Sequence, residues 1–222
     1  MRTDSFLKSN SLNLVIVFVT FNYFIVHHVG QGTFSPLAFI LDTGWASMWT
    51  ITFILAAQAG TFWLILNAES RRLLFERIAL LYIFQIYCFR EADIHSYYTS
   101  PKGWNSVTNG KFFTQSDAPM MLKIIMGLVL ISFALCALYL LIRYFVPLFK
   151  QFFQGIPHAV AFGLWGIYLV TSQVCDRTSL NKSAVHSIKN IEEMCELTAA
   201  LFAFAAVVQY ILKRSKENKL SA

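Results

Sequence analysis

The stretch IALLYIFQIYCFREADIH, residues 78–95, joins a long apolar run to a short group of ionisable residues. A helix that crosses the hydrocarbon core of a bilayer needs about 20 mainly apolar residues, so this run fits a membrane span. Because a charge is costly inside a bilayer, ionisable residues near the end of a span mark candidate functional sites. The stretch therefore predicts a membrane helix that carries a candidate site at one end.

The composition of the whole chain favours a membrane protein with several spans. Of its 222 residues, 56% are hydrophobic and 14% are charged, whereas a soluble domain carries about 25% charged residues. The net charge of +6 is not a nucleic-acid signal here, because most Lys and Arg stand at the ends of apolar runs and set the orientation of membrane helices. We therefore expect membrane lipid, and no nucleic acid, as a partner.

Six apolar segments are long enough to cross the membrane. They are Leu12–His28, Trp45–Leu66, Leu74–His95, Met120–Tyr144, Pro157–Cys175 and Glu193–Leu212. These segments predict an all-α membrane protein, a six-transmembrane-helix bundle with residues 1–222 in a single integral membrane domain. Eleven of the 18 Lys and Arg fall on the side of the termini and seven on the other, so the positive-inside rule predicts that both termini are cytoplasmic.

This topology brings ionisable residues from three helix ends to one depth on the outer side of the membrane. Glu91 and His95 are four residues apart and share a helix face, whereas Asp93 points about 200° away from Glu91. The other acidic residues at this depth come from the ends of the last two segments. The candidate metal ligands are Glu91, His95, Asp176, Glu192, Glu193 and Glu196.

Two interpretations of this cluster stay open. In the first, the carboxylate and imidazole groups bind a divalent metal ion, for which Zn, Mn and Fe suit the ligand types. Asp93 is then the candidate catalytic base for a metal-bound water. In the second, the acidic residues form a salt-bridge network with Arg90 and Arg177, because charges inside a membrane usually pair with one another.

The patterns Arg90-Glu-Ala-Asp-Ile-His95 and Glu192-Glu-Met-Cys-Glu196 resemble those of a group of uncharacterised bacterial polytopic inner-membrane proteins that carry R-E-x-D-x-H and E-E-x-x-E. The resemblance covers the two motifs and the helix pattern. It implies a location in the bacterial inner membrane, and it implies no particular activity.

Two classes of function follow from the two interpretations of the acidic cluster. The first is a metal-dependent hydrolase that acts on a lipid or another amphiphile at the outer surface of the membrane. The second is a non-catalytic transporter or structural partner subunit, whose polar cluster only holds the bundle together. A redox protein that binds haem or quinone is a third class, and His158, alone on the inner side, gives a two-haem arrangement no support.

Overall fold

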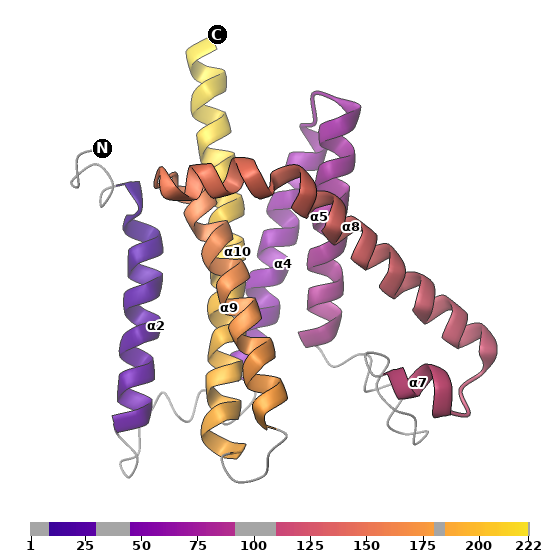
Figure 1. The fold of residues 1–222 in the computed structure, drawn as a ribbon. Coiled ribbons are helices and arrows are strands. Elements are labelled where there is room, and N and C mark those ends of the chain that lie inside the picture. The colour runs from indigo at the N-terminus through magenta and orange to yellow at the C-terminus, as the bar shows by residue number, and fades with distance from the viewer. Residues whose placement is uncertain (1–8, 30–44, 92–109, 180–184, 222) are drawn as a thin grey trace. The chain divides into compact units, whose positions relative to one another are not determined.

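The computed structural model describes residues 9–29, 45–91, 110–179 and 185–221, and the described residues are all-helical, without a strand among them. Figure 1 shows the helices in chain order. They are α2 (Ser11–Val29), α4 (Trp45–Leu66), α5 (Arg71–Glu91), α7 (Gly110–Gln115), α8 (Met120–Phe153), α9 (Pro157–Ser179) and α10 (Val185–Ser221). The predicted helical class is confirmed.

Four of these helices are long and apolar enough to cross a membrane. The apolar segments are Met48–Leu66, Met120–Phe153, Pro157–Cys175 and Ile191–Glu217. The described part of α2 contains the shorter apolar helix Ser11–Thr20, and α5 carries Glu76 and Arg77 within its first two turns. Four helices therefore have the length and composition that the prediction of a membrane protein requires, and the count of six spans stays a prediction.

The helix boundaries agree with the predicted segments at some ends and extend beyond them at others. The helices α2, α4 and α9 coincide with the predicted segments to within a few residues. In contrast, α8 continues past Tyr144 to Phe153, and α10 extends beyond the predicted segment at both ends. The predicted end of the third segment at His95 lies outside the described residues, which in α5 reach Glu91.

The chain divides into two compact units. Unit 1 is formed by residues 1–60 and 146–222, and unit 2 by residues 61–145. The boundary between the units falls within α4 and within α8, so each of these helices contributes to both. The expectation of a single domain stays a prediction.

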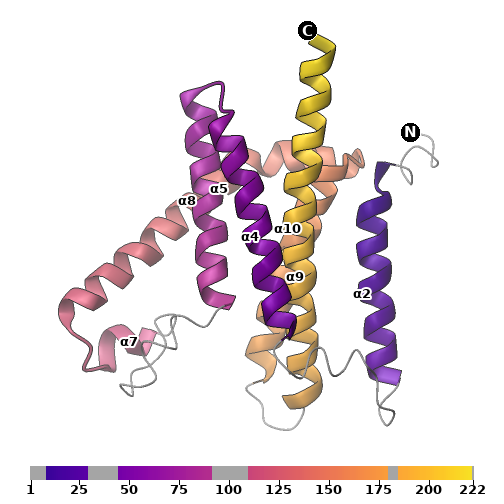
Figure 2. The same ribbon diagram turned by 180° about the vertical axis from the view of Figure 1, so that it is seen from behind.

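The central element of unit 1 is α10, which packs along α9 and also contacts α2. Its buried residues are mostly alanines, and small side chains allow membrane helices to approach closely. The alanines that are at most 3% exposed are Ala199, Ala200, Ala203, Ala205 and Ala206. The first part of α4 also approaches α10 closely (Figure 2), because a Cβ atom on Gly60 would lie only 2.6 Å from Cγ1 of Val207.

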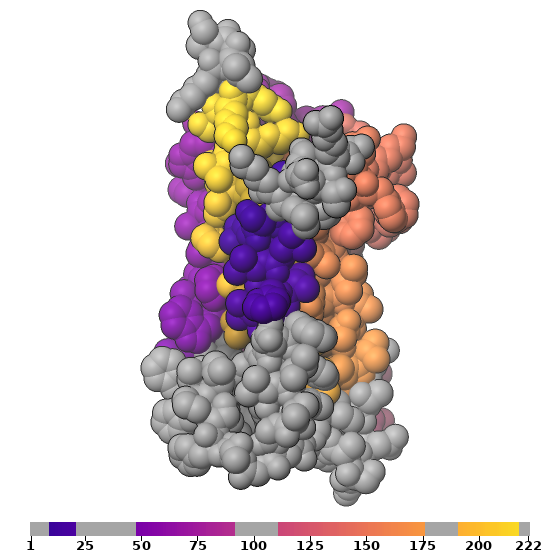
Figure 3. All heavy atoms as spheres, turned by 90° about the vertical axis from the view of Figure 1, so that its left-hand side faces the viewer, coloured from indigo at the N-terminus to yellow at the C-terminus, as the bar shows by residue number. Residues whose placement is uncertain are grey.

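Polar contacts fix α2 against the rest of unit 1. The fully buried Asn13 donates a hydrogen bond to the carbonyl oxygen of Pro157 at 3.0 Å, and its own side-chain oxygen accepts one from Gln209 at 3.0 Å. Two turns further along α2, the hydroxyls of Thr20 and Thr198 lie 3.3 Å apart. Figure 3 shows the described part of α2 lying over α9 and α10. Interhelical hydrogen bonds of this kind stabilise membrane bundles, where apolar burial against lipid contributes little.

Unit 2 is held together by a buried ionic group at the start of α5. Glu76 is 5% exposed, and its carboxylate contacts Arg72 at 3.2 Å and Arg143 at 3.5 Å. The hydroxyl of Tyr144 donates a hydrogen bond to the same carboxylate. The neighbouring Arg77, which is also buried, donates to the carbonyl oxygen of Leu64 and joins α5 to the end of α4. These contacts fasten α5 to α4 and to α8.

Candidate functional site

The helix pair α9 and α10 holds a carboxylate inside an apolar segment of unit 1. Ser172 on α9 is fully buried, and its hydroxyl donates a hydrogen bond of 2.9 Å to Oε1 of Glu196 on α10. Glu196 lies within the apolar segment Ile191–Glu217. A carboxylate in an apolar environment is costly unless hydrogen bonds or charges compensate for its lost hydration, and Ser172 supplies one such bond. The pair places Glu196 at the contact between the two helices.

The residues around Glu196 connect three helices. Thr198 follows two positions later, about 200° around α10, and it meets Thr20 of α2 on that other side. Glu192 and Glu193 are half-buried and lie one turn before Glu196. Because Glu192 and Glu196 are four residues apart, they share one face of α10. Glu192, Glu193 and Glu196 therefore lie within about one turn of α10, next to the hydroxyl groups of Ser172 on α9 and Thr20 on α2.

The remaining residues of the predicted cluster lie either in unit 2 or outside the described side chains. Glu91 and Arg90 are half-buried at the end of α5 and belong to unit 2, whereas Glu196 belongs to unit 1. Asp93 and His95 lie outside the described residues. Asp176 and Arg177 lie in the last turn of α9, and their side chains are outside the described set. The convergence of these residues in one pocket stays a prediction.

The predicted metal site extends beyond the described side chains. Within the side chains that the structure describes, no group of three or more His, Cys, Asp and Glu could hold a metal ion. That set omits His95 and Asp176, which are two of the six predicted ligands. The prediction of Zn, Mn or Fe therefore stays untested by this geometry.

The ionic group around Glu76 is a feature that sequence reasoning missed. The signal in the sequence was weak: Arg72 and Glu76 have the four-residue spacing of a helical ion pair, and Arg143 and Tyr144 stand at the predicted end of the fourth segment. The observed contacts show that this chain compensates a buried carboxylate with two arginines and a tyrosine hydroxyl.

His158 takes part in a polar contact at the start of α9. It is 8% exposed, its Nε2 atom lies 3.1 Å from Oε1 of Gln151, and its ring meets that of Tyr210 edge to face at 5.6 Å. The partners fill the space around the imidazole with an amide and a phenol ring. His158 therefore serves to connect the end of α8, α9 and α10.

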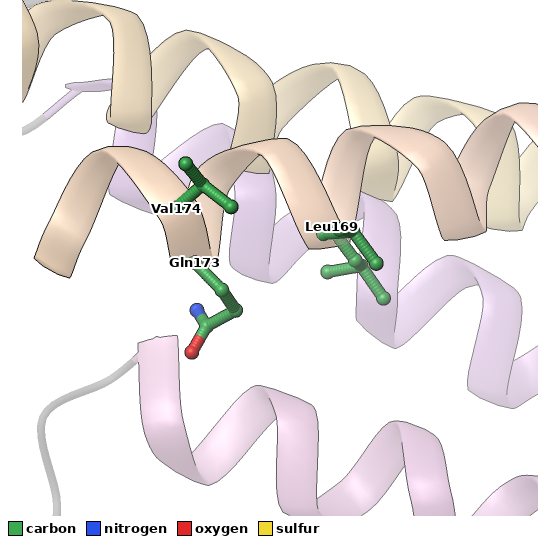
Figure 4. A pocket seen from close by; sticks show the side chains of 4 residues that line it. Leu169, Gln173 and Val174 are labelled. Atoms are coloured by element: carbon green, nitrogen blue, oxygen red, sulfur yellow. The ribbon is translucent and has the colours of Figure 1, made fainter.

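A shallow hollow lies on the outer surface of α9. Its volume is about 320 Å³, and it is lined by Leu169, Val170, Gln173 and Val174. Figure 4 shows the side chain of Gln173 with its amide directed away from the helix axis. Among the residues that the structure describes, the side chains that line this hollow are one amide and three aliphatic groups.

Comparisons of the chain with models of protein families, with curated proteins and with solved structures find no match.

Proposed function

We propose that the chain is an integral protein of a bacterial inner membrane, that it crosses the membrane six times, and that both termini are cytoplasmic. We further propose that the acidic residues of α5, α9 and α10 form a divalent-metal site on the outer side, at which a lipid or another amphiphile is hydrolysed. The observation that supports this function is the hydrogen bond from Ser172 to Glu196.

This hydrogen bond supports a functional role because of where the carboxylate lies. Ionisable residues within membrane segments usually face the interior of the bundle and mark substrate, ion or proton sites. Glu196 follows this rule, since its carboxylate contacts α9 rather than the outer surface of α10. A carboxylate can accept about four hydrogen bonds, and the hydroxyl of Ser172 donates one of them.

The proposed chemistry assigns a role to each predicted residue. Glu91, His95, Asp176 and Glu196 would bind the metal ion, with Glu192 or Glu193 completing the ligand set. A bound metal ion lowers the pKa of its water ligand and polarises the bond under attack. Asp93, two residues after the end of α5, would accept the proton of that water.

The second candidate is a non-catalytic membrane protein, a transporter or structural partner subunit in which Arg90 and Arg177 neutralise the acidic residues. One observation favours this candidate. The same chain already uses two arginines to compensate the buried carboxylate of Glu76, and a comparable network on α9 and α10 would need no metal ion.

Metal analysis of the purified full-length protein tests the two candidates. If the site binds metal, the protein will carry Zn, Mn or Fe, and His95→Ala and Glu196→Gln will each lower the metal content. Glu217→Gln is the matched control, because Glu217 is an exposed residue of α10 that pairs with Lys213. A protein that is metal-free as purified and unchanged in melting temperature by a chelator or by added Zn or Mn would refute the hydrolase. In the network candidate, Arg90→Ala and Arg177→Ala are the damaging changes and His95→Ala is mild.

A further inference from the structure

The helix α8 is too long to lie entirely within the hydrocarbon core. It has 34 residues, which corresponds to about 51 Å of helix, whereas the core is about 30 Å thick. A straight helix of this length would fit within the core only at a tilt of more than about 50°, beyond the usual range of up to about 40°. A straight α8 would therefore extend beyond the core, and Pro147, which lies inside the helix, allows the last turns to bend away from its main direction.

The last two turns of α8 expose an apolar face that contains one lysine. Val146, Phe149 and Phe153 are 55%, 53% and 71% exposed, and Lys150 is also exposed. These four residues have the spacing i, i+3, i+4 and i+7, so they share one helix face. The rings of Phe149 and Phe153 contact each other edge to face, with 4.7 Å between their centroids.

Two other residues of the same two turns, Phe152 and Gln151, contact the start of α9. The ring of Phe152 lies so close to Gly163 on α9 that a Cβ atom there would be 2.6 Å from the ring. Gln151 contacts His158 at 3.1 Å. Phe149 and Phe153 stay more than half exposed beside these contacts, so the described residues of α9 leave their face uncovered.

The direction of this segment agrees with a position along the membrane surface. In both ribbon views the end of α8 runs across the direction of α9 and α10 (Figures 1 and 2). His158 and Tyr210, which are in contact, mark the level of this crossing on α9 and α10. The basic residues Lys213, Arg214 and Lys216 follow within the next two turns of α10, so positive charge gathers on the same side.

We propose that residues 146–153 form a lipid-binding segment at the membrane surface, on the side where α10 ends, and that this segment binds anionic phospholipids. Phe149 and Phe153 enter the boundary between headgroups and acyl chains, as the apolar residues of interfacial helices do. Lys150 extends its aliphatic stem along this layer and places its ammonium group at the lipid phosphates. The proposal depends on the membrane setting and not on the hydrolase chemistry.

The charge on this face selects an anionic lipid as the occupant. A face that bound only acyl chains would not carry a lysine along its edge, because a charge in the core is costly. The matching partner has apolar chains beside a negative headgroup. Basic residues near a membrane surface attract anionic lipids in this way.

Fluorine NMR on the full-length protein in nanodiscs tests the proposal. A trifluoromethyl-phenylalanine is placed at position 149 or 153, and at Leu55 as a control, because Leu55 is 49% exposed in the middle of an apolar segment. The nanodiscs contain equal parts of phosphatidylcholine and phosphatidylglycerol. We expect a nitroxide near the lipid headgroup to broaden the signals at 149 and 153 most, and a nitroxide at the chain end to broaden the signal at Leu55 most.

Three results would overturn the proposal. Signals at 149 and 153 that are broadened by a water-soluble gadolinium chelate and not by lipid would place the face in water. Signals that behave like that of Leu55 would place it in the core. Signals that no reagent broadens would show that protein, such as a second copy of the chain, covers the face.

The preference for anionic lipid is tested with the same fluorine label. With the fluorine probe at position 149, headgroup-labelled phosphatidylglycerol should broaden the signal more than headgroup-labelled phosphatidylcholine. Lys150→Gln should reduce this preference about fivefold, which corresponds to the loss of one lysine near an anionic surface. Lys111→Gln, at an exposed lysine of α7, is the control and should leave the preference unchanged. An unchanged preference in Lys150→Gln would refute the assignment to anionic lipid.

Discussion

The close approach of α4 and α10 predicts that Gly60→Ala destabilises the protein. A Cβ atom at position 60 would lie 2.6 Å from Cγ1 of Val207, which is well inside van der Waals contact. Val207 is 4% exposed, and a β-branched residue in a helix has essentially one favourable χ1 rotamer. The valine therefore cannot turn away, and the two helices must separate or distort.

The expected magnitude follows from two opposing effects. An added methyl group in a well-packed core costs about 1–3 kcal/mol, whereas replacing Gly by Ala in the interior of a helix gains about 0.5–1 kcal/mol. The net loss expected for Gly60→Ala is therefore about 1 kcal/mol in the free energy of unfolding. Gly166→Ala on α9 is the matched control, because a Cβ atom there meets nothing within 4 Å. This control should gain about 0.5–1 kcal/mol, so the difference between the two variants isolates the steric effect.

Unfolding of the full-length protein in mixed micelles, with increasing sodium dodecyl sulfate and helix content as the signal, measures both variants. The double variant Gly60→Ala/Val207→Ala adds a second test, because the new methyl group takes up space that the valine leaves. Its free energy of unfolding should differ from the sum of the single changes by about 1–2 kcal/mol, as is usual for residues in contact. If Gly60→Ala were as stabilising as Gly166→Ala, or if the two single effects were additive, α4 and α10 would not be in the contact described.

Three further predictions concern topology, the ionic group and the buried carboxylate. Single cysteines at Ser100 and Ser221, in a chain without its native cysteines, should react with impermeant reagents from opposite sides of the membrane; labelling of both from the same side would end the six-span topology. Glu76→Leu should lower the free energy of unfolding by about 1–3 kcal/mol, because Arg72 and Arg143 lose their partner but are exposed enough to regain hydration. Tyr144→Phe removes one hydrogen bond and should cost about 1 kcal/mol, and equal stability of all three proteins would show that the group is unimportant. Ser172→Ala should cost about 1.5–3 kcal/mol in the same assay, as a hydrogen bond to a carboxylate is lost; no change would mean that Glu196 does not depend on that hydroxyl.

The sequence predicts the apolar helices well because hydropathy reports which residues can lie in lipid. The ends of α2 and α4 are marked in this way, and they agree with the structure. Hydropathy does not mark the ends of α8 and α10, because the hydrogen bonds of a helix can continue beyond the apolar run into charged sequence. Arg143 and Lys150 interrupt the apolar run of α8 without interrupting the helix, so the hydropathy pattern stopped short of Phe153.

The side-chain contacts were less predictable for a geometric reason. Helical spacing shows that Glu192 and Glu196 share a face, but it does not say which neighbour that face meets. The rotation of α10 about its own axis depends on where its alanines pack, and this rotation brings Glu196 to Ser172. The contacts of Glu76 depend in the same way on which turn of α8 reaches α5. Contacts between helices therefore required the structure, whereas contacts within a helix could be predicted.

The central position of α10 has a consequence for biosynthesis. This helix follows in the chain all the helices that it contacts, and ribosomes add about 5–20 residues per second. Roughly 10–30 s therefore separate the synthesis of α2 from that of α10. During this interval Asn13 and Thr20 lack the partners that α10 later supplies. A ribosome that stalls before α10 leaves polar side chains facing lipid, and such an unfinished bundle is a substrate for the proteases that remove misassembled membrane proteins.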